Sequence, residues 1–352
     1  MSEAQKPTQQ DARLEIVAEF DKSQPIGVSV SSDNRVFVSF PRREPYLMGL
    51  SEIIDGQRVA YPNPSWNARE VQSESQFVNV QDIFVDANNH LWVLDSKPAS
   101  ANSIFGSDDA KTPSLGQFKL VQIDLNSDTV VKQYDFPDLD KSKSALNDVR
   151  VDTQKKLAYL SDPGLAAIVV LDLTTGSSRS VLNQSNYTLA LDSIVLSYEG
   201  NEMRDVQGKP FKSNVNGIAL TKDNEYLYFK PINATQLYRI NTHYLADKNI
   251  TKADLSAKVE NLGQTVVTHG LVADQDGNIY LTSSLDYSIK RLSPDGKLTT
   301  IVQDSSLIWP DSLGIGSDGY LYFSCAQVNR LPQWNQNLDM TEYPYRVYRV
   351  KI

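Results

Sequence analysis

The stretch HGLVADQDGNIYLTSS, residues 269–284, contains the pattern that decides the fold. Apolar and polar residues alternate on both sides of the turn DQDGN, which is typical of a β-hairpin, because strand side chains point alternately to two faces. Asp, Asn and Gly tolerate the positive φ angles that tight hairpin turns need. We therefore expect two antiparallel strands here, with the polar residue His269 at the start of the first strand.

The same hairpin pattern occurs six times along the chain. Its copies are IGVSVSSDNRVFVSF from Ile26, QDIFVDANNHLWVLDS from Gln81, NDVRVDTQKKLAYLSD from Asn147, NGIALTKDNEYLYFK from Asn216, HGLVADQDGNIYLTSS from His269 and DSLGIGSDGYLYFSC from Asp311. A second hairpin follows most copies, such as FKLVQIDLNSDTVVKQYDF after the second one. Two hairpins make a four-stranded sheet, and such sheets repeated around one axis form a propeller. The sequence therefore predicts an all-β, six-bladed β-propeller.

The two ends of the chain fit this fold as well. After the sixth hairpin only one strand remains, YRVYRVKI, residues 345–352. The segment RLEIVAEF, residues 13–20, can supply the missing fourth strand, so that N-terminal and C-terminal strands close the ring and leave fewer exposed edges. We predict one propeller domain over residues 13–352, preceded by a flexible segment, residues 1–12. Two stacked β-sandwiches are the alternative, but they explain neither the six equivalent hairpins nor the odd final strand.

The long segments between the predicted strands are all expected on one face of the ring. In a propeller, the first strand of each blade starts, and the second strand ends, at the same face. The long segments of both kinds are residues 41–78, 97–116, 184–213 and 326–343. Loops longer than about 12–15 residues are usually functional. We expect these four to build a walled cup over the mouth of the central channel.

The first residue of each hairpin copy should lie at the floor of this cup. Five of the six are polar, namely Gln81, Asn147, Asn216, His269 and Asp311, and the sixth is Ile26. Polar groups that converge in a concave site orient a small ligand; the alternative is that they cap strands and hold channel water. The ends of the second strands give further candidates for ligand binding, which are Ser96, Asp162, Lys230, Ser283 and Ser284. Trp309 and Phe229 lie beside these rings, where each forms either an aromatic wall or part of the core.

Composition argues against several classes of partner. The net charge is −9 and no basic patch is present, so binding of nucleic acid is not expected. No apolar stretch approaches the roughly 20 residues that span a bilayer, and the N-terminus is too polar for a signal peptide. A single cysteine, Cys325, excludes an intramolecular disulfide. We expect a monomer whose partner is a small molecule.

Several segments, in order, resemble the major royal jelly protein/yellow family. They include RVFVSFPRREPYLMGLSEI followed by AYPNPSWN, then AYLSDPGLAAIVVLDLTTG and WPDSLGIGSDGYLYFSCAQVNRL, and the resemblance runs from about residue 35 to residue 331. It implies a six-bladed propeller, a central pocket for small ligands such as aromatic biogenic amines, and an extracellular or periplasmic location. It implies no shared catalytic residues. The chain lacks the paired cysteines and signal peptide of animal members, so it resembles a divergent, bacterial member.

The hairpin copies also resemble a second six-bladed class, the gluconolactonase-like lactonases and paraoxonase-type esterases, which hold calcium at the channel mouth. NDVRVD and NGIALTKD look like their metal-binding segments, so the metal candidates are Asn147, Asn216 and Asp311. However, Ile26 and His269 stand where this resemblance implies Glu and Asp, and calcium prefers six to eight oxygen ligands. We therefore expect no cofactor, with calcium or another divalent metal only under this alternative reading.

Enzymatic activity is left open by the sequence. If the protein is a hydrolase, His269 and Asp311 are the candidate catalytic residues, as a general-base pair. We favour a neutral, hydrogen-bonding role for His269, because neighbouring blades hold these two residues. A protein-interaction platform built from the cup loops is a third class, to which the acidic charge gives little support.

Overall fold

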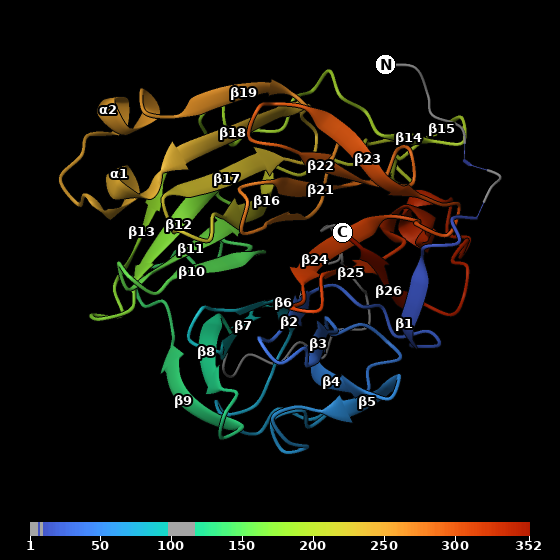
Figure 1. Ribbon diagram of the computed structural model, residues 1–352. Coiled ribbons are helices and arrows are strands. Elements are labelled where there is room, and N and C mark those ends of the chain that lie inside the picture. Colours follow the sequence, from blue (N-terminus) through green and yellow to red (C-terminus); the bar gives the residue numbers. More distant parts are fainter. Residues whose placement is uncertain (1–5, 8–9, 98–116) are drawn as a thin grey trace.

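The computed structural model describes residues 6–7, 10–97 and 117–352, and its sheets form a closed ring (Figure 1). Six antiparallel sheets of four strands each are arranged around a central axis. This arrangement confirms the predicted six-bladed propeller. Blade 1 consists of β2 (Val28–Val30), β3 (Val36–Ser39), β4 (Leu50–Ile54) and β5 (Gln57–Ala60). Blade 2 consists of β6 (Val80–Val85), β7 (His90–Asp95), β8 (Lys119–Asp124) and β9 (Thr129–Tyr134).

The next three blades repeat this order. Blade 3 consists of β10 (Val149–Asp152), β11 (Leu157–Asp162), β12 (Ala167–Asp172) and β13 (Ser178–Val181). Blade 4 consists of β16 (Val215–Leu220), β17 (Tyr226–Pro231), β18 (Gln236–Asn241) and β19 (Glu260–Gln264), with the short helices α1 (Thr242–Ala246) and α2 (Lys252–Ser256) before β19. Blade 5 consists of β20 (Leu271–Ala273), β21 (Ile279–Ser283), β22 (Ser288–Leu292) and β23 (Leu298–Gln303).

Blade 6 closes the ring with strands from both ends of the chain. It contains β24 (Pro310–Ile315), β25 (Tyr320–Cys325), β26 (Arg346–Lys351) and β1 (Glu15–Glu19). The outermost strand β1 pairs antiparallel with β26, with Glu15 opposite Arg349 and Glu19 opposite Arg346. Both pairs carry ion pairs, at 2.7 Å and 2.8 Å. The predicted closure by residues 13–20 is therefore confirmed.

The hydrophobic core is divided among the blade interfaces. Each of the six interfaces between neighbouring blades holds its own cluster of buried apolar side chains. The cluster between blades 3 and 4, for example, joins Tyr159 and Val170 to Ile218 and Phe229. Strands whose two faces both meet a neighbouring sheet read as continuous apolar runs, such as AIVVLD in β12. Burial between blades thus fixes the distance of every inner strand from the axis.

Two glycines allow the inner strands to approach one another closely at the axis. A Cβ atom on Gly270 would lie 1.9 Å from the backbone oxygen of Asp311, and one on Gly217 would lie 2.8 Å from that of His269. Neither spacing is compatible with a side chain. Because each glycine directly follows a candidate site residue, Asn216 or His269, this contact brings the starts of neighbouring blades together.

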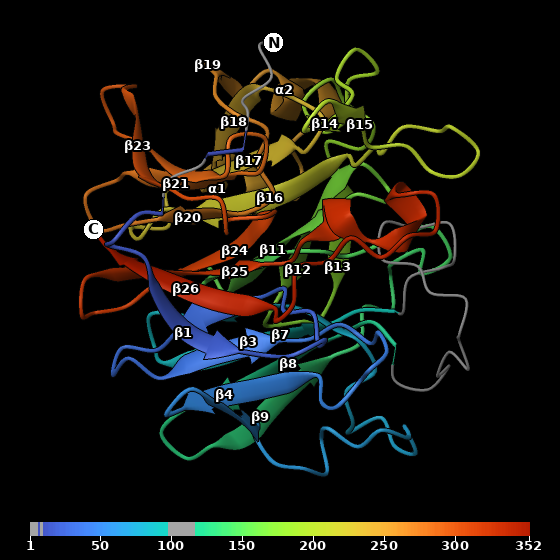
Figure 2. The ribbon, with the colours of Figure 1, turned by 90° about the vertical axis from the view of Figure 1, so that its right-hand side faces the viewer.

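The long connecting segments gather on one side of the ring, on the right in Figure 2. They include residues 184–213, which contain the small hairpin of β14 (Ser197–Tyr198) and β15 (Asn201–Glu202). They also include residues 326–343, with the 3-10 turns η1 (Val328–Arg330) and η2 (Pro332–Trp334). The expectation for residues 97–116 falls almost entirely outside the described residues.

One expectation about these segments is wrong in part. Residues 41–78 are not a single insertion, because β4 and β5 of blade 1 lie within them. The turn residues Asp55 and Gly56 join these strands and both have positive φ angles. The short segment LSEIIDGQRVA therefore forms the second hairpin that the repeat requires, and only its flanking loops extend the cup.

Two further observations concern the ends of the chain and its helices. Of the segment expected to be flexible, residues 1–12, Lys6 forms an ion pair of 2.9 Å with Glu342, and the backbone N–H of Asp11 donates to Asp304. Its flexibility stays a prediction. No helix in the described part of the chain has the length and apolar character needed to cross a membrane.

Removing β1 should weaken the closed ring. A chain that starts at residue 21 lacks β1 and the buried Phe20, and it leaves β26 as an exposed edge. We expect the melting temperature to fall by about 5 °C or more, with aggregation on heating. A chain that starts at residue 11 keeps β1 and serves as the control. Equal melting temperatures for both truncated chains would contradict the role of β1, as measured by differential scanning calorimetry.

Candidate functional site

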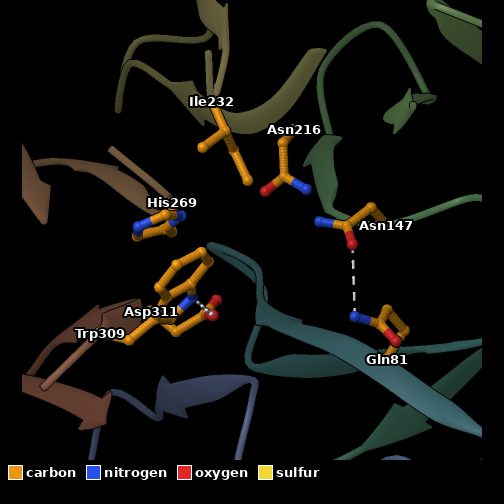
Figure 3. A pocket seen from close by; sticks show the side chains of 7 residues that line it. All are labelled: Gln81, Asn147, Asn216, Ile232, His269, Trp309 and Asp311. Atoms are coloured by element: carbon orange, nitrogen blue, oxygen red, sulfur yellow. Dashed lines mark hydrogen bonds between the residues drawn. The ribbon is translucent and has the colours of Figure 1, made fainter. Parts of the chain in front are cut away.

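The predicted polar ring exists at the mouth of the central channel. Five residues that start the hairpin copies line one small hollow, together with Ile232 and Trp309; the five are Gln81, Asn147, Asn216, His269 and Asp311. Figure 3 shows their side chains pointing toward one another from five different blades. The sixth hairpin start, Ile26, lies in an apolar cluster beside Trp309 rather than in the hollow lining.

The amide side chains on one side of the hollow are only partly paired. The amide nitrogen of Gln81 donates to Asn147 Oδ1 at 3.3 Å, and Asn147 Nδ2 donates to Asp148 Oδ1 at 2.7 Å. Asn216 is only 6% exposed, and no hydrogen bond of its side chain to another described residue is found. Buried amide groups are normally hydrogen-bonded, because leaving one without a partner costs about 1–3 kcal/mol. The side-chain amide of Asn216 is therefore free to form hydrogen bonds with a ligand.

Asp311 is a carboxylate without a cationic partner among the described residues. The indole N–H of Trp309 donates to Asp311 Oδ2 at 3.1 Å. The pKa of Asp311 is raised to about 7, mainly by burial; the Trp309 hydrogen bond lowers it and the nearby charge of Asp82 raises it. Near neutral pH this carboxyl group therefore exchanges between its charged and neutral forms. A cation placed beside it would favour the charged form.

His269 is a neutral hydrogen-bonding group. Its imidazole stacks on Trp309, with ring centroids 3.8 Å apart, and Nε2 lies 2.7 Å from Ser284 Oγ. Burial lowers the pKa of His269 to about 3, and the charge of Lys230 contributes. Since a general base works best with a pKa near the operating pH, His269 is poorly suited to that role. No hydrogen bond joins His269 to Asp311; Trp309 contacts both.

The predicted second ring does not line this hollow. Asp162 accepts hydrogen bonds from Ser144 Oγ and from the backbone N–H groups of Ala145 and Leu165, which ties a loop to blade 3. Lys230 is fully buried, its ammonium donates to the backbone oxygen of Val266, and burial lowers its pKa to about 7. The other members, Ser96, Ser283 and Ser284, are buried. Ligand contacts by Asp162, Lys230 and Ser283 stay a prediction.

A buried charged group near the hollow was missed by the sequence reasoning. Arg150 forms an ion pair of 2.9 Å with Asp82, and both side chains are almost completely buried. Burial and the neighbouring Asp82 raise the pKa of Asp148, which lies next to Asn147. These residues could have been found in the sequence, because QDIFVD and NDVRVD place charged residues beside the hairpin starts. Asp82, Asp148 and Asp311 influence one another's pKa in this part of the channel, and Lys222 lies near Arg150.

An apolar cover packs against the hollow. Buried residues from the long segments surround Trp309 in what we call the top-face cluster, which contains Ile26, Ile194, Leu196, Tyr198, Met203, Phe211, Ile232, Val267, Trp309, Ala326, Val328 and Leu331. The hollow has about 260 Å³ of free space when counted out to open solvent, but the centre of a water molecule can occupy only about 10 Å³ of it. That is enough room for about one water molecule.

Calcium fits this set of side chains poorly. The metal candidates Asn147, Asn216 and Asp311 do lie together around the hollow, but Asn147 Oδ1 already accepts from Gln81. Only a few oxygens remain, whereas calcium takes six to eight. In addition, no group of three His, Cys, Asp or Glu side chains placed to hold a metal ion is found within residues 6–7, 10–97 and 117–352.

Comparison with known proteins identifies the relatives of the chain. A family model described as major royal jelly protein matches residues 78–352. Major royal jelly protein 1 of Apis mellifera is 24% identical over 294 residues, which cover 75% of this chain and 63% of that protein. Major royal jelly protein 7 of the same species is 26% identical over 229 residues, which cover 63% of this chain and 48% of that protein. The chain thus spans less than two thirds of either relative.

Solved structures with a similar fold include several enzymes. A gluconolactonase from Xanthomonas campestris superposes with a TM-score of 0.55 at 10% identity, covering 97% of this chain and 90% of that one. A streptogramin B lyase gives 0.52 at 14% identity, covering 96% and 97%. The calcium-binding protein regucalcin from Agrobacterium tumefaciens gives 0.54 at 11% identity, covering 96% and 93%. At these identities the similarity shows the propeller fold alone.

Replacing Asp311 by Asn should change how stability depends on pH. Because the pKa of Asp311 is raised in the folded protein, the folded state binds more protons than the unfolded chain between about pH 4 and pH 7. Stability therefore falls as the pH rises through this window.

The Asp311→Asn variant lacks this loss, so we expect it to be more stable than the wild type at pH 8, by on the order of 2 kcal/mol, and closer to it at pH 4. Thermal melts at both pH values measure the difference, with the exposed residue changed in Asp276→Asn as the control. A constant difference between Asp311→Asn and wild type at the two pH values would contradict the raised pKa.

Proposed function

Because the chain belongs to the major royal jelly protein family, we propose that it is a small-molecule binding protein that holds its ligand at the top-face mouth of the propeller channel. We further propose that the ligand is a protonated amine whose ammonium group enters the hollow beside Asp311. Aromatic amines, the ligand class that the family resemblance implies, are the first candidates.

The observation that carries this proposal is the half-buried carboxyl group of Asp311, for which no cationic partner is found among the described residues. Burying a charge without a partner is costly, so such a group is expected where a ligand or a proton supplies the missing charge. An ammonium group is similar in size to a water molecule, and the hollow has room for about one water molecule. The unpaired amide of Asn216 offers a further hydrogen-bond acceptor for the same group.

The apolar groups around the hollow suit the remainder of such a ligand. Trp309 and Ile232 line the hollow and also belong to the top-face cluster. An aromatic ring attached to the ammonium is too large for the hollow, so it would have to lie toward this cluster and displace some of its side chains. Burial of apolar surface stabilises this placement, and the face of an indole also attracts a cation.

The alternative, a metal-dependent hydrolase of the lactonase or arylesterase type, has weaker support. In its favour, this chain shares the propeller fold with the gluconolactonase and regucalcin structures. The three candidate metal ligands also lie together around the hollow. However, the candidate ligands offer too few free oxygens for a calcium site. The lowered pKa of His269 also makes it a poor general base. Turnover of a lactone or aryl ester that EDTA abolishes, and that Asn147→Ala loses, would favour this alternative instead.

The amine proposal predicts binding that depends on pH. Below pH 7 an amine has to expel the proton of Asp311, so its affinity should rise about tenfold per pH unit from pH 5 toward pH 7 and then level off. Phenethylamine, measured by isothermal titration calorimetry between pH 5 and pH 8, is a suitable probe.

Variants of the site make the test specific. Asp311→Asn should lose at least about tenfold in affinity at pH 8, because the counter-charge is gone. Asp276→Asn, which removes an exposed carboxylate elsewhere in blade 5, should bind like the wild type. The proposal fails if a panel of aromatic amines gives no binding at pH 8, or if Asp311→Asn binds them equally well.

A further inference from the structure

The starting observation is a chain of two hydrogen bonds behind the hollow. His269 Nε2 lies 2.7 Å from Ser284 Oγ, and Ser284 Oγ lies 2.9 Å from the hydroxyl of Tyr198. All three side chains are buried, and Tyr198 comes from the β14–β15 hairpin of the top-face loop. The other imidazole nitrogen, His269 Nδ1, is buried without a hydrogen-bond partner. His269 is also one of the residues that line the hollow (Figure 3).

The number of available hydrogens decides which group donates and which accepts in these two hydrogen bonds. A neutral imidazole carries one N–H, and each hydroxyl carries one hydrogen. If Tyr198 donates to Ser284 and Ser284 donates to Nε2, both hydroxyl hydrogens are used, and only an N–H at Nδ1 is left without a partner. If instead Nε2–H donates to Ser284, two groups stay unpaired: a hydroxyl hydrogen and the lone pair of Nδ1. Each unpaired buried group is unfavourable, so the first arrangement is preferred.

We propose that Ser284, which is hydrogen-bonded to Tyr198 behind it, is a positioning residue that holds His269 as the Nδ1–H tautomer, so that its one free hydrogen is a donor for the ligand. This inference rests on the proposed function of the hollow. His269 and Asp311 both contact Trp309, so the donor and the carboxylate serve the same small space. The ligand class is then an amine with a neutral oxygen acceptor close to its nitrogen, because a carboxylate would be repelled by Asp311, which is charged above pH 7.

The tautomer can be observed without any ligand. In ¹⁵N-labelled protein, the ring nitrogens of His269 should show a protonated Nδ1 and an unprotonated Nε2 that do not change between pH 5 and pH 8, since the pKa of His269 is about 3. His90 and His243 supply reference signals in the same spectrum. Ser284→Ala removes the donor to Nε2, so the proton should redistribute between the two nitrogens.

Two controls separate this effect from general damage. Ser324→Ala removes another buried serine hydroxyl, which bonds Ile26 and Ser312 instead of His269, and it should leave the tautomer unchanged. Tyr198→Phe keeps Ser284 as the donor to Nε2 and should keep the Nδ1–H form. A proton on Nε2 in the wild type, or an unchanged tautomer in Ser284→Ala, would overturn the proposal.

A matched pair of amines tests whether the donor selects the ligand. 2-Amino-1-phenylethanol carries a hydroxyl where 2-phenylpropylamine carries a methyl group of similar size. The wild type should bind the first about fivefold to tenfold more tightly, and Ser284→Ala should lose this preference. If the wild type binds both amines equally tightly, His269 does not select the hydroxyl group, although the proposal that amines bind still holds. If neither amine binds, the proposed function fails, and the tautomer measurement still decides the relay.

Discussion

The functional centre of this protein depends on how closely six inner strands approach one axis. Gly217 and Gly270 mark the tightest contacts, where a Cβ atom would clash with the backbone of the next blade. Residues that are far apart in sequence, such as Asn147 and Asp311, therefore line the same hollow. The same closeness limits the hollow to about one water molecule, so under the proposed function only a small head group could enter it.

Two buried ion pairs of the propeller contrast with the half-buried carboxyl group of Asp311. Lys119 pairs with Asp95 at 2.9 Å, and Arg150 pairs with Asp82 at 2.9 Å, each inside the protein. Such pairs hold strands and loops in register, because removing one partner leaves a buried charge. Asp311 has a hydrogen bond from Trp309 but no such cation among the described residues. The proposed recognition of a cation would give this carboxyl group a partner that the described residues do not supply.

The sequence predicted the fold well, because the propeller consists of hairpins that each have a recognisable local sequence pattern. Each hairpin shows its alternation and turn residues, so six copies and the closing strand at residues 13–20 could be counted directly. The hairpin of β4 and β5 was missed, because LSEIIDGQRVA is short and lies in a segment otherwise rich in loop residues. Strand starts at equivalent positions also identified the polar ring, apart from Ile26, whose apolar side chain packs beside Trp309 instead.

Contacts between blades could not be predicted in the same way. Whether Asp162 reaches the hollow depends on the direction of its side chain, and it bonds a neighbouring loop. The pair of Arg150 with Asp82 joins blades 2 and 3 across the channel, and the relay from Tyr198 to His269 joins a top-face loop to blade 5. Such contacts form only once the ring is assembled, so no periodicity in the sequence reveals them.

The pairing of β1 with β26 has a consequence for how the protein is made. During synthesis β1 leaves the ribosome before the other strands of the propeller, but its partner β26 follows after all of them. Blades 1 to 5 can each pair their own strands as they emerge, because every one of them is continuous in sequence. Blade 6 has to wait until β26 has left the ribosome. This blade, which supplies Asp311 to the channel mouth, is therefore the last one to be completed.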